Sequence, residues 1–519
     1  MSDDVADLIL RSGRIHTFDE GHSVVEALAA RSGRIEAVGS DREVLRLRGA
    51  RTRVIDLRGR FALPGFVDCH THFAKRALGI TRVDLHPSKS LDDMLARLKR
   101  QRARTAPGAW VLGRGWDEST WTQKRFPTRA ALDRVIADRP VKASRVDGHS
   151  CVVNSLGWKA LRMPKRFPGV ELDGAGRPTG VLKEQAYEET LDRIVDPPEL
   201  YRHALPRMER VAHKLGVTTV CDFVDPKDLR AYGERAREGK MGVRVVAAIW
   251  ARHLDSLEAS GVGAGLGDKW LRVTGVKFYG DGSIGSRTAA MRRPYRDDAG
   301  NRGQLNLRRP AMAKLIGRAR HLGLQVCVHA IGDRGVDEVI AAFEAAAKGV
   351  ARKKFRSERH RIEHCELVDG RGIARMARLG LVASMQPNFV GKWSRAGLLY
   401  DQRIGNFWHG HDNPMREIAD AGVPIAFGSD NMPFSPLFGI NSAVNAPYPS
   451  QRLTVDEALC AYTRGAAWAL REEATRGTLE HGKLADVVAL NGDPYDAPDR
   501  IEELKVSLTA LGGRVVHGK

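Results

Sequence analysis

The chain has 519 residues, a formal net charge of +20, and 42% hydrophobic with only 6% aromatic residues. That length exceeds what one small core supports, so we expect one large domain and a second, smaller one. No apolar run reaches about 18 residues, which argues against a membrane span. The acidic start MSDDVADLIL lacks the basic and apolar regions of a signal peptide, which predicts a cytoplasmic protein without a membrane partner.

A positive charge of this size can indicate a nucleic-acid-binding protein. Here the basic residues are spread along the whole chain, and their densest clusters, 97–104 and 351–361, are typical of solvated helices or loops. This distribution predicts a basic enzyme surface without a specific nucleic-acid site. A polyanion-binding protein is the alternative from another functional class. The six cysteines are scattered without a CxxC pair, as expected for reduced thiols.

Both ends of the chain are rich in β-type patterns. Residues 1–62 contain RSGRI twice, and each copy is a Ser-Gly turn followed by an apolar run. Residues 475–519 contain ADVVALNGDPYD and VSLTALGGRVVHGK, with another Gly-Gly-Arg turn. We therefore expect the two ends to build one small β-sandwich domain together.

Residues 63–474 alternate between apolar strand candidates and helical stretches. Eight strands with intervening helices predict an α/β fold of the (β/α)₈ barrel type. The insertion at 79–200 is too long for a simple barrel loop, so we expect a subdomain over the barrel mouth. The strand candidates are 62–70, 217–224, 243–251, 273–280, 324–332, 360–367, 381–389 and 424–432.

Polar side chains that can bind metal fall at or near the carboxyl ends of several predicted strands. In a barrel these ends converge on the face that carries the active site. Taken singly, each has an ordinary explanation, such as a packed core histidine or a helix cap. Their joint placement at the same ends of separate strands favours one site. The residues are His70 and His72 on one strand face, Lys277, His329, His364 and Asp430.

This pattern resembles the amidohydrolase superfamily, and within it the amidohydrolase-3 group of YtcJ-like proteins and N-substituted formamide deformylases. The resemblance covers nearly the whole chain and implies a (β/α)₈ barrel with a β-sandwich made from both chain ends. The motifs that carry it are LPGFVDCHTH (63–72), GWDESTW (115–121), RVDGHSCVVNS (145–155), GRPTGVLKE (176–184), VKFYGDGSIGSRTA (276–289), HAIGDRG (329–335), RIEHCE (361–366), QPNF (386–389), FGSDNMP (427–433) and GKLADVVAL (482–490).

The resemblance implies metal-binding roles for the polar residues at the strand ends. His70, His72 and Asp430 would hold a buried divalent ion, and His329 with His364 would hold a second. Imidazole and carboxylate ligands suit Zn²⁺, with Mn²⁺, Fe²⁺ or Co²⁺ as possible substitutes. The metal would activate water as hydroxide, and Asp430 would shuttle its proton to the leaving amine.

Lys277 lies inside an apolar strand, where an unpaired ammonium is costly. The resemblance implies an N-carboxylated lysine that bridges two metals. Glu184 is the alternative bridging ligand, since its carboxylate needs no modification. A third reading is a structural lysine, at a sheet edge or paired with Asp222 or Asp281.

The remaining candidates lie in the insertion and the loops. A second HxH pair, His409 and His411, occurs in a Gly/Pro/Asn-rich stretch and is expected to be a decoy rather than a metal site. Substrate contacts are expected from the insertion and the mouth loops, although structural roles are an alternative for each. These candidates are Trp116, Trp121, His149, Arg287 and Asn388.

The favoured function is hydrolysis of an amide-type C–N bond in a small molecule: an N-acyl, N-formyl, carbamate or cyclic amide. The alternative within the fold is a ring deaminase, which would need a Glu three residues after His329, where this chain has Gly332. A metal-free relative without activity is disfavoured because every expected ligand position is filled. We expect a homodimer.

Overall fold

The computed structural model describes residues 5–194, 196, 198–408 and 410–518. The chain forms two compact units. The barrel unit comprises residues 1–73, 206–281 and 289–519, and the insertion unit comprises residues 74–205 and 282–288. In the described residues, no helix combines the length and apolar character needed to cross a membrane.

The barrel unit is built around a nearly closed parallel sheet with the order β22-β21-β20-β19-β18-β16-β15-β8. The end strands β8 and β22 also lie against each other. This arrangement confirms the predicted (β/α)₈ barrel. The strands are β8 (Phe66–Thr71), β15 (Val217–Val224), β16 (Arg244–Trp250), β18 (Leu271–Tyr279), β19 (Gln325–Ala330), β20 (Arg361–His364), β21 (Val382–Met385) and β22 (Ile425–Phe427).

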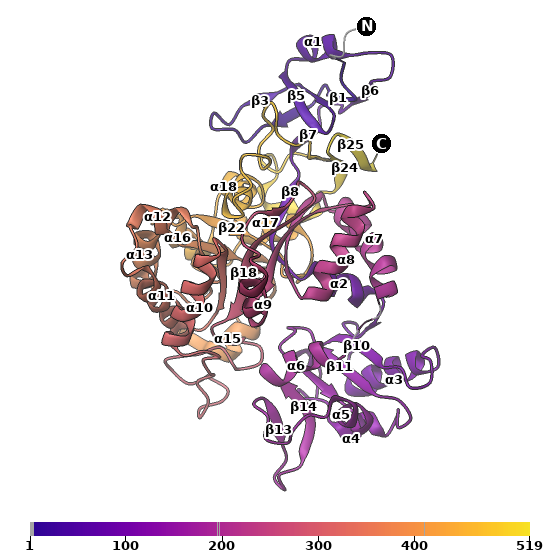
Figure 1. The fold of residues 1–519 in the computed structure, drawn as a ribbon, viewed down its shortest axis with the longest axis vertical. Helices are drawn as coiled ribbons and strands as arrows, with labels where there is room; N and C mark the ends of the chain where they lie inside the picture. The colour runs from indigo at the N-terminus through magenta and orange to yellow at the C-terminus, as the bar shows by residue number, and fades with distance from the viewer. Residues whose placement is uncertain (1–4, 195, 197, 409, 519) are drawn as a thin grey trace. The chain divides into compact units, whose positions relative to one another are not determined.

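Helices follow the barrel strands and cover the outside of the sheet (Figure 1). Their apolar faces are buried, as in α11, where the buried residues recur with helical spacing. The helices after the second to eighth strands include α8 (Pro226–Arg237), α9 (Leu254–Ser260), α10 (Arg309–His321), α11 (Asp333–Ala347), α13 (Gly370–Leu379), α14 (Pro387–Trp393), α16 (Met415–Asp420) and α17 (Pro436–Val444).

The two chain ends form the extra β domain. One four-stranded sheet has the order β5-β4-β1-β6, and a six-stranded sheet, β25-β24-β23-β7-β2-β3, combines strands from both ends (Figure 1). Their shared core is a cluster of buried aliphatic side chains. The strands are β1 (Leu8–Arg11), β2 (Arg14–His16), β3 (Val24–Val25), β4 (Ala27–Arg31), β5 (Arg34–Gly39), β6 (Arg53–Asp56), β7 (Phe61–Pro64), β23 (Val487–Leu490), β24 (Val506–Leu511) and β25 (Arg514–Gly518).

The first predicted barrel strand, 62–70, is two strands in the structure. β7 ends at Pro64 and pairs in the β domain, whereas β8 begins at Phe66 in the barrel. Gly65 separates them, and a Cβ there would lie 2.3 Å from the hydroxyl oxygen of Thr218. A Pro-Gly pair at this close approach ends one strand and lets the chain change sheets.

The insertion unit has its own six-stranded sheet, with the order β13-β14-β12-β11-β10-β9, and its own hydrophobic core. It also includes residues 282–288, which follow β18 in the chain. The expected position of this insertion over the barrel mouth stays a prediction. Its strands are β9 (Val83–Asp84), β10 (Val111–Trp116), β11 (Val141–Arg145), β12 (Ser150–Val153), β13 (Val170–Leu172) and β14 (Pro178–Lys183).

Candidate metal centre

The carboxyl ends of β8 and β22 meet at the candidate metal centre. The backbone N–H of Asp430 donates to the carbonyl of His70 at 2.9 Å. Gly428 permits this approach, since a Cβ there would lie 2.3 Å from the His70 nitrogen. Asp430 has φ of 46°, a left-handed conformation that turns the chain sharply after β22. The first and last barrel strands thus bring a histidine and a carboxylate together from distant parts of the sequence.

Four of the predicted ligands converge here. One ligand atom each from His70, His364 and Asp430 lies within 4.8 Å of the others. Asp430 Oδ1 is 3.9 Å from His70 Nε2 and 3.6 Å from His72 Nε2. Ligands about 2.1 Å from one tetrahedral ion are roughly 3.4 Å apart, so these spacings suit a single divalent ion. His364 was expected to bind a second ion together with His329. In the structure it also lies with His70 and Asp430, which were expected to bind the first ion.

His364 reaches the centre because the backbone leaves the regular strand pattern. Side chains on a strand alternate between faces, so Glu363 and His364 would normally point in opposite directions. His364 has φ of 71° and Cys365 has φ of 54°. β20 ends at this left-handed turn, which lets Glu363 and His364 both contact His70. Glu363 forms a hydrogen bond with it, and the ring centroids of His364 and His70 are 4.7 Å apart.

His329 lies beside the same centre and faces Asp281. Its Nε2 is 3.8 Å from Asp281 Oδ1, and its ring centroid is 4.4 Å from that of His364. The Asp281 carboxylate also accepts backbone hydrogen bonds from Ala290, Ile331 and Gly332. Asp281 is thus a buried brace between the loops after β18 and β19, a function that its Gly-Asp-Gly context did not reveal.

The donor atoms fit a divalent metal. Burial, followed by the nearby charge of Lys277, lowers the pKa of His70 to about 3, so its imidazole is neutral at pH 7. Its Nδ1 is hydrogen-bonded to Glu363 at 2.6 Å, whereas its buried Nε2 has no hydrogen-bond partner among the described residues. A neutral, oriented imidazole with one nitrogen left over is what a metal ligand requires.

Glu363 and Arg361 were not singled out from the sequence. Both are fully buried, and Arg361 donates to Glu363 Oε1 at 2.7 Å. Burial alone would raise the pKa of Glu363, but Arg361 and His70 hold it well below its usual value. The sequence did contain an indication of their role. A charged residue inside a buried strand, such as Arg361, Glu363 or Lys277, needs a partner that offsets the cost of burying its charge.

A closed circuit of rings surrounds the centre. Neighbouring ring centroids are 4.4 to 6.1 Å apart around the whole circuit, and His72 stacks on Trp250 with an interplanar angle of 4°. Packing on both sides restricts how each imidazole can turn. The circuit runs through His70, His72, Trp250, Tyr279, His329 and His364.

Lys277 is buried on β18, which pairs with β16 on one side and β19 on the other, so it is not an edge-strand lysine. Its Nζ lies 4.2 Å from the ring centroid of Phe223. In the described part of the chain, neither Asp222 nor Asp281 forms an ion pair with it. Burial, only partly offset by Glu363, lowers the pKa of Lys277 to about 8.

Glu184, the rival bridging ligand, lies in the insertion unit. Its carboxylate accepts from Thr288 at 2.5 Å and contacts His149 Nδ1 at 3.0 Å. Its backbone has φ of 44° and ψ of −115°, where α6 (Gln185–Arg193) begins. Burial alone would lower the pKa of His149, but Glu184 raises it to about 9. The His149 imidazole is therefore protonated at neutral pH.

Replacing His149 by Gln should cost more stability at pH 6 than at pH 10. The folded pKa of about 9 exceeds the ordinary 6.5, so the stabilisation is complete below 6.5 and is lost as the pH rises through 9. The expected difference between the two pH values is up to about 3 kcal/mol. Urea unfolding of both proteins measures it, and an equal cost at both pH values would contradict the charged pair.

Two of the expected substrate contacts are core residues of the insertion unit. Trp116 and Trp121 are 0% and 2% exposed, and their indole N–H groups donate to the carbonyls of Ala143 and Ser88. Both indoles are packed in the core and their N–H groups are hydrogen-bonded, so their observed role is structural, and a contact with substrate stays a prediction. Aromatic residues flanking a turn motif gave no indication of their burial.

Asn388 is also buried, at the start of α14. Its side-chain amide donates to the carbonyl of Pro433 at 2.7 Å, and its oxygen accepts from Tyr462. It therefore braces the loop that follows Asp430, and the expected contact with substrate stays a prediction. Arg287 is half-buried in segment 282–288, with φ of 56°.

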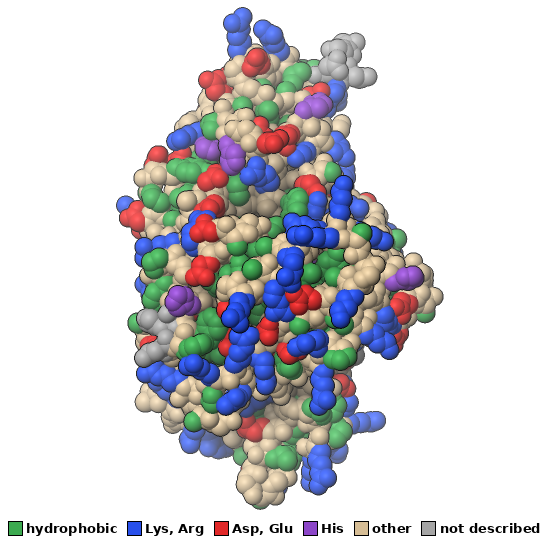
Figure 2. Space-filling model, turned by 90° about the vertical axis from the view of Figure 1, so that its left-hand side faces the viewer, with side chains coloured by type: hydrophobic (Ala, Val, Ile, Leu, Met, Phe, Trp, Pro, Cys, Tyr) green, Lys and Arg blue, Asp and Glu red, His purple; other side chains and the backbone are tan. Residues whose placement is uncertain are grey.

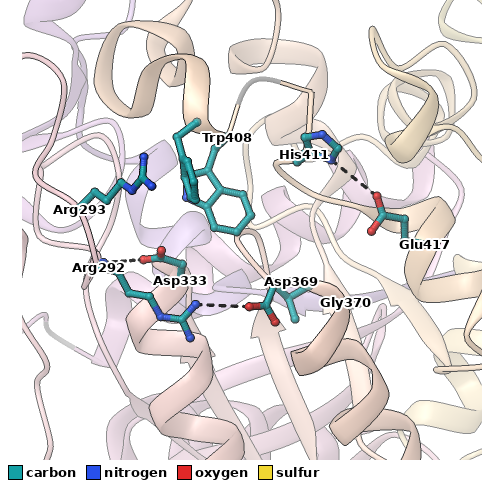
Figure 3. A pocket seen from close by; sticks show the side chains of 10 residues that line it. Arg292, Arg293, Asp333, Asp369, Gly370, Trp408, His411 and Glu417 are labelled. Carbon is teal, nitrogen blue, oxygen red and sulfur yellow. Dashed lines mark hydrogen bonds and ion pairs between the residues drawn. The ribbon is translucent and has the colours of Figure 1, made fainter.

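A pocket of about 450 Å³ opens beside the loops that follow β19 and β20 (Figure 3). Trp408 forms one wall, Arg292 pairs with Asp369 at 3.4 Å, and His411 faces Glu417 at 3.8 Å. His411, one of the expected decoy pair, thus contacts Glu417, and its exclusion from metal binding stays a prediction. Its companion, His409, lies outside the described residues.

A family model described as the amidohydrolase family, Amidohydro_3, matches residues 53–517. The chain belongs to the amidohydrolase family. It is therefore a hydrolase of the class that acts on carbon–nitrogen bonds other than peptide bonds.

Individual relatives of this amidohydrolase cover nearly its whole length. YtcJ of Bacillus subtilis (strain 168) is 29% identical over 98% of this chain and 99% of its own. The N-substituted formamide deformylase of Arthrobacter pascens is 28% identical over 98% and 97%. A crystal structure of an uncharacterized metal-dependent hydrolase from Pyrococcus furiosus is 31% identical, with a TM-score of 0.76, and the match covers 94% of this chain and 99% of that one.

Proposed function

We propose that this amidohydrolase uses a divalent metal, most simply Zn²⁺, to hydrolyse an amide-type C–N bond in a small molecule. The observation that carries the proposal is the convergence of three imidazoles and one carboxylate at the ends of β8, β20 and β22. His70 supplies a buried nitrogen that makes no hydrogen bond within the described residues. A buried polar atom without a hydrogen-bond partner destabilises the folded protein unless a ligand, such as a metal ion, binds it.

The proposed ligands are His70, His72, His364 and Asp430, with His329 and Lys277 beside them. A divalent ion held there supplies Lewis-acid chemistry, because it lowers the pKa of water and polarises a carbonyl. Asp430 is the proposed proton shuttle. Its side chain is 17% exposed, whereas that of His70 is 1% exposed, so of these two it is the one open to solvent. It would accept the proton of the attacking water and pass it to the leaving amine.

Ring deamination is disfavoured by the structure of the loop after β19. The position where a deaminase would carry its acid is Gly332. A Cβ on Gly332 would lie 2.1 Å from the carbonyl oxygen of Ala290, so no side chain fits there. Its N–H donates to Asp281, which fixes the backbone in place.

A polyanion-binding function is also disfavoured. Figure 2 shows Lys and Arg side chains spread over the visible face with Asp and Glu among them. Many arginines are paired with carboxylates, as are Arg318 with Glu258 and Arg375 with Glu344. A nucleic-acid site would instead gather unpaired basic and aromatic side chains on one surface.

Two relatives support an amide-type substrate. One is named an N-substituted formamide deformylase, and another, from Rhizorhabdus wittichii, is named an imidazolonepropionase and is 27% identical over 93% of this chain. The first name describes removal of a formyl group from a substituted nitrogen. The substrate panel for this protein therefore comprises N-formyl, N-acyl, carbamate and cyclic amide compounds.

The purified protein is expected to contain about one to two equivalents of transition metal by elemental analysis. Removing the metal with a chelator should abolish hydrolysis of the best panel substrate, and Zn²⁺ or Mn²⁺ should restore it. Finding no metal in the protein and no gain of activity on adding either ion would overturn the proposal.

A further inference from the structure

Three buried groups form a continuous chain beside the metal centre. The guanidinium of Arg361 donates to Glu363 Oε1 at 2.7 Å, and Glu363 Oε2 is 2.6 Å from His70 Nδ1. Each of these side chains is at most 1% exposed. One carboxylate oxygen is therefore used by the arginine and the other by the histidine.

Arg361 also holds the backbone beside His70. Its second nitrogen donates to the carbonyl of Cys69 at 2.9 Å, and its third lies 3.6 Å from Cys221 Sγ. Strand β20, which carries Arg361, is separated from β8 by β21 and β22 in the sheet order. The guanidinium thus reaches across the barrel interior and contacts both the chain before His70 and the carboxylate that holds its ring.

Packing alone does not explain this arrangement. A buried ion pair is often no more stabilising than apolar residues of the same volume, because both charges must leave water. The apolar cluster of the barrel interior includes Val67, Cys69 and Cys327 on other strands, and Lys277 is buried near Glu363 as well. A charged pair among them is best explained by its contact with His70, the candidate metal ligand whose ring Glu363 holds.

We propose that Glu363, fixed by Arg361, is a positioning residue that keeps the proton of His70 on Nδ1 and directs Nε2 towards Asp430 and His364. An imidazole that donates from Nδ1 offers its Nε2 lone pair to a metal. The inference rests on the proposed function, since it requires that a metal bind at His70.

The test compares the zinc affinity of the full-length wild type with that of Glu363→Gln and Glu363→Asp. Gln keeps the shape but loses the charge, and Asp keeps the charge but withdraws it from Nδ1. Metal-free protein is titrated with Zn²⁺ against a competing chelator, and the absorption spectrum of the Co²⁺ form is recorded. Both variants should bind Zn²⁺ about 10- to 100-fold more weakly and show an altered Co²⁺ spectrum.

A matched control separates positioning from stability. Glu209 is a buried glutamate in the same unit that accepts from Arg235 at 2.6 Å and from the Gly242 N–H at 2.9 Å. Its contacts include none of the candidate ligands. Glu209→Gln should lower the thermal unfolding temperature and leave the zinc affinity and the Co²⁺ spectrum unchanged.

The outcomes are distinct. The inference is overturned if either Glu363 variant, folded by circular dichroism, binds Zn²⁺ as tightly as wild type with the same Co²⁺ spectrum. It is also overturned if Glu209→Gln weakens binding equally, because the effect is then general destabilisation. If one Glu363 variant does not fold, the other decides. A wild type that binds no metal would instead refute the proposed function itself.

Discussion

Replacing Asp430 by Asn should lower kcat/KM by at least about 1,000-fold while leaving the fold intact. The carboxylate is both a proposed ligand and the proposed proton shuttle, and an amide cannot take up a proton. Asn should be tolerated structurally, because Asp430 has φ of 46° and Asn is among the residues that adopt this conformation most readily. Steady-state kinetics on the best panel substrate measures the loss, and thermal unfolding shows that the variant is folded.

The control for this variant is Asp56→Asn. Asp56 forms a half-exposed ion pair with Arg11 in the β domain. Its contacts include none of the candidate metal ligands. A pair of this kind contributes about 0–1 kcal/mol, so activity and stability should both stay close to wild type. If Asp430→Asn retained a tenth or more of the wild-type activity, the shuttle assignment would be wrong.

Replacing Lys277 by Met should reduce metal content and turnover while making the metal-free protein more stable. If the amine is carboxylated and bridges two metals, its loss removes a shared ligand, and we expect at least about a 100-fold fall in kcat. Elemental analysis and kinetics measure these effects. Full activity with full metal content would show that Lys277 is not the bridge.

The stability of the metal-free variant follows from the pKa of Lys277. Burial lowers this pKa from 10.5 to about 8, so at pH 7 the folded state pays for a buried ammonium that the unfolded state keeps in water. Removing it should gain up to about 3 kcal/mol, less about 1 kcal/mol for the lost contact with Phe223. The advantage over wild type should shrink as the pH rises from 8 to 10.5, because the wild-type lysine then loses its charge in both states.

Lys142 offers a matched control for Lys277. It is also buried, its pKa is lowered to about 8 by burial, and its Nζ lies 4.6 Å from the ring centroid of Tyr187. It lies in the insertion unit and hydrogen-bonds Thr190 rather than any candidate ligand. Lys142→Met should leave metal content and turnover unchanged, so any loss in Lys277→Met reflects its position at the centre.

Much of the fold was predictable because its signals are local. Apolar runs separated by helical stretches predicted eight strands, and their parallel pairing in chain order follows from the helices that connect them. The boundary between β7 and β8 at Gly65 was not predicted, because the two strands form one continuous apolar run in the sequence. Only the partners of each half, the β domain and the barrel, distinguish the two strands.

The site was predictable in kind but not in arrangement. The sequence by itself determined which candidate ligands lie on which strands, since His70, His72 and Asp430 stand at strand ends that must converge in a closed barrel. It could not assign Trp116 to a core or Glu363 to His70, because spacing along a strand carries no information about contacts across a barrel interior.

The tertiary structure decided how these residues meet. The left-handed turn at His364 brings its imidazole to the same centre as His70, against the alternation of the strand. Arg361 crosses from β20 to the backbone of β8, which is remote in the sheet order. Such contacts depend on barrel closure, and closure is a property of all eight strands together rather than of any one segment of the sequence.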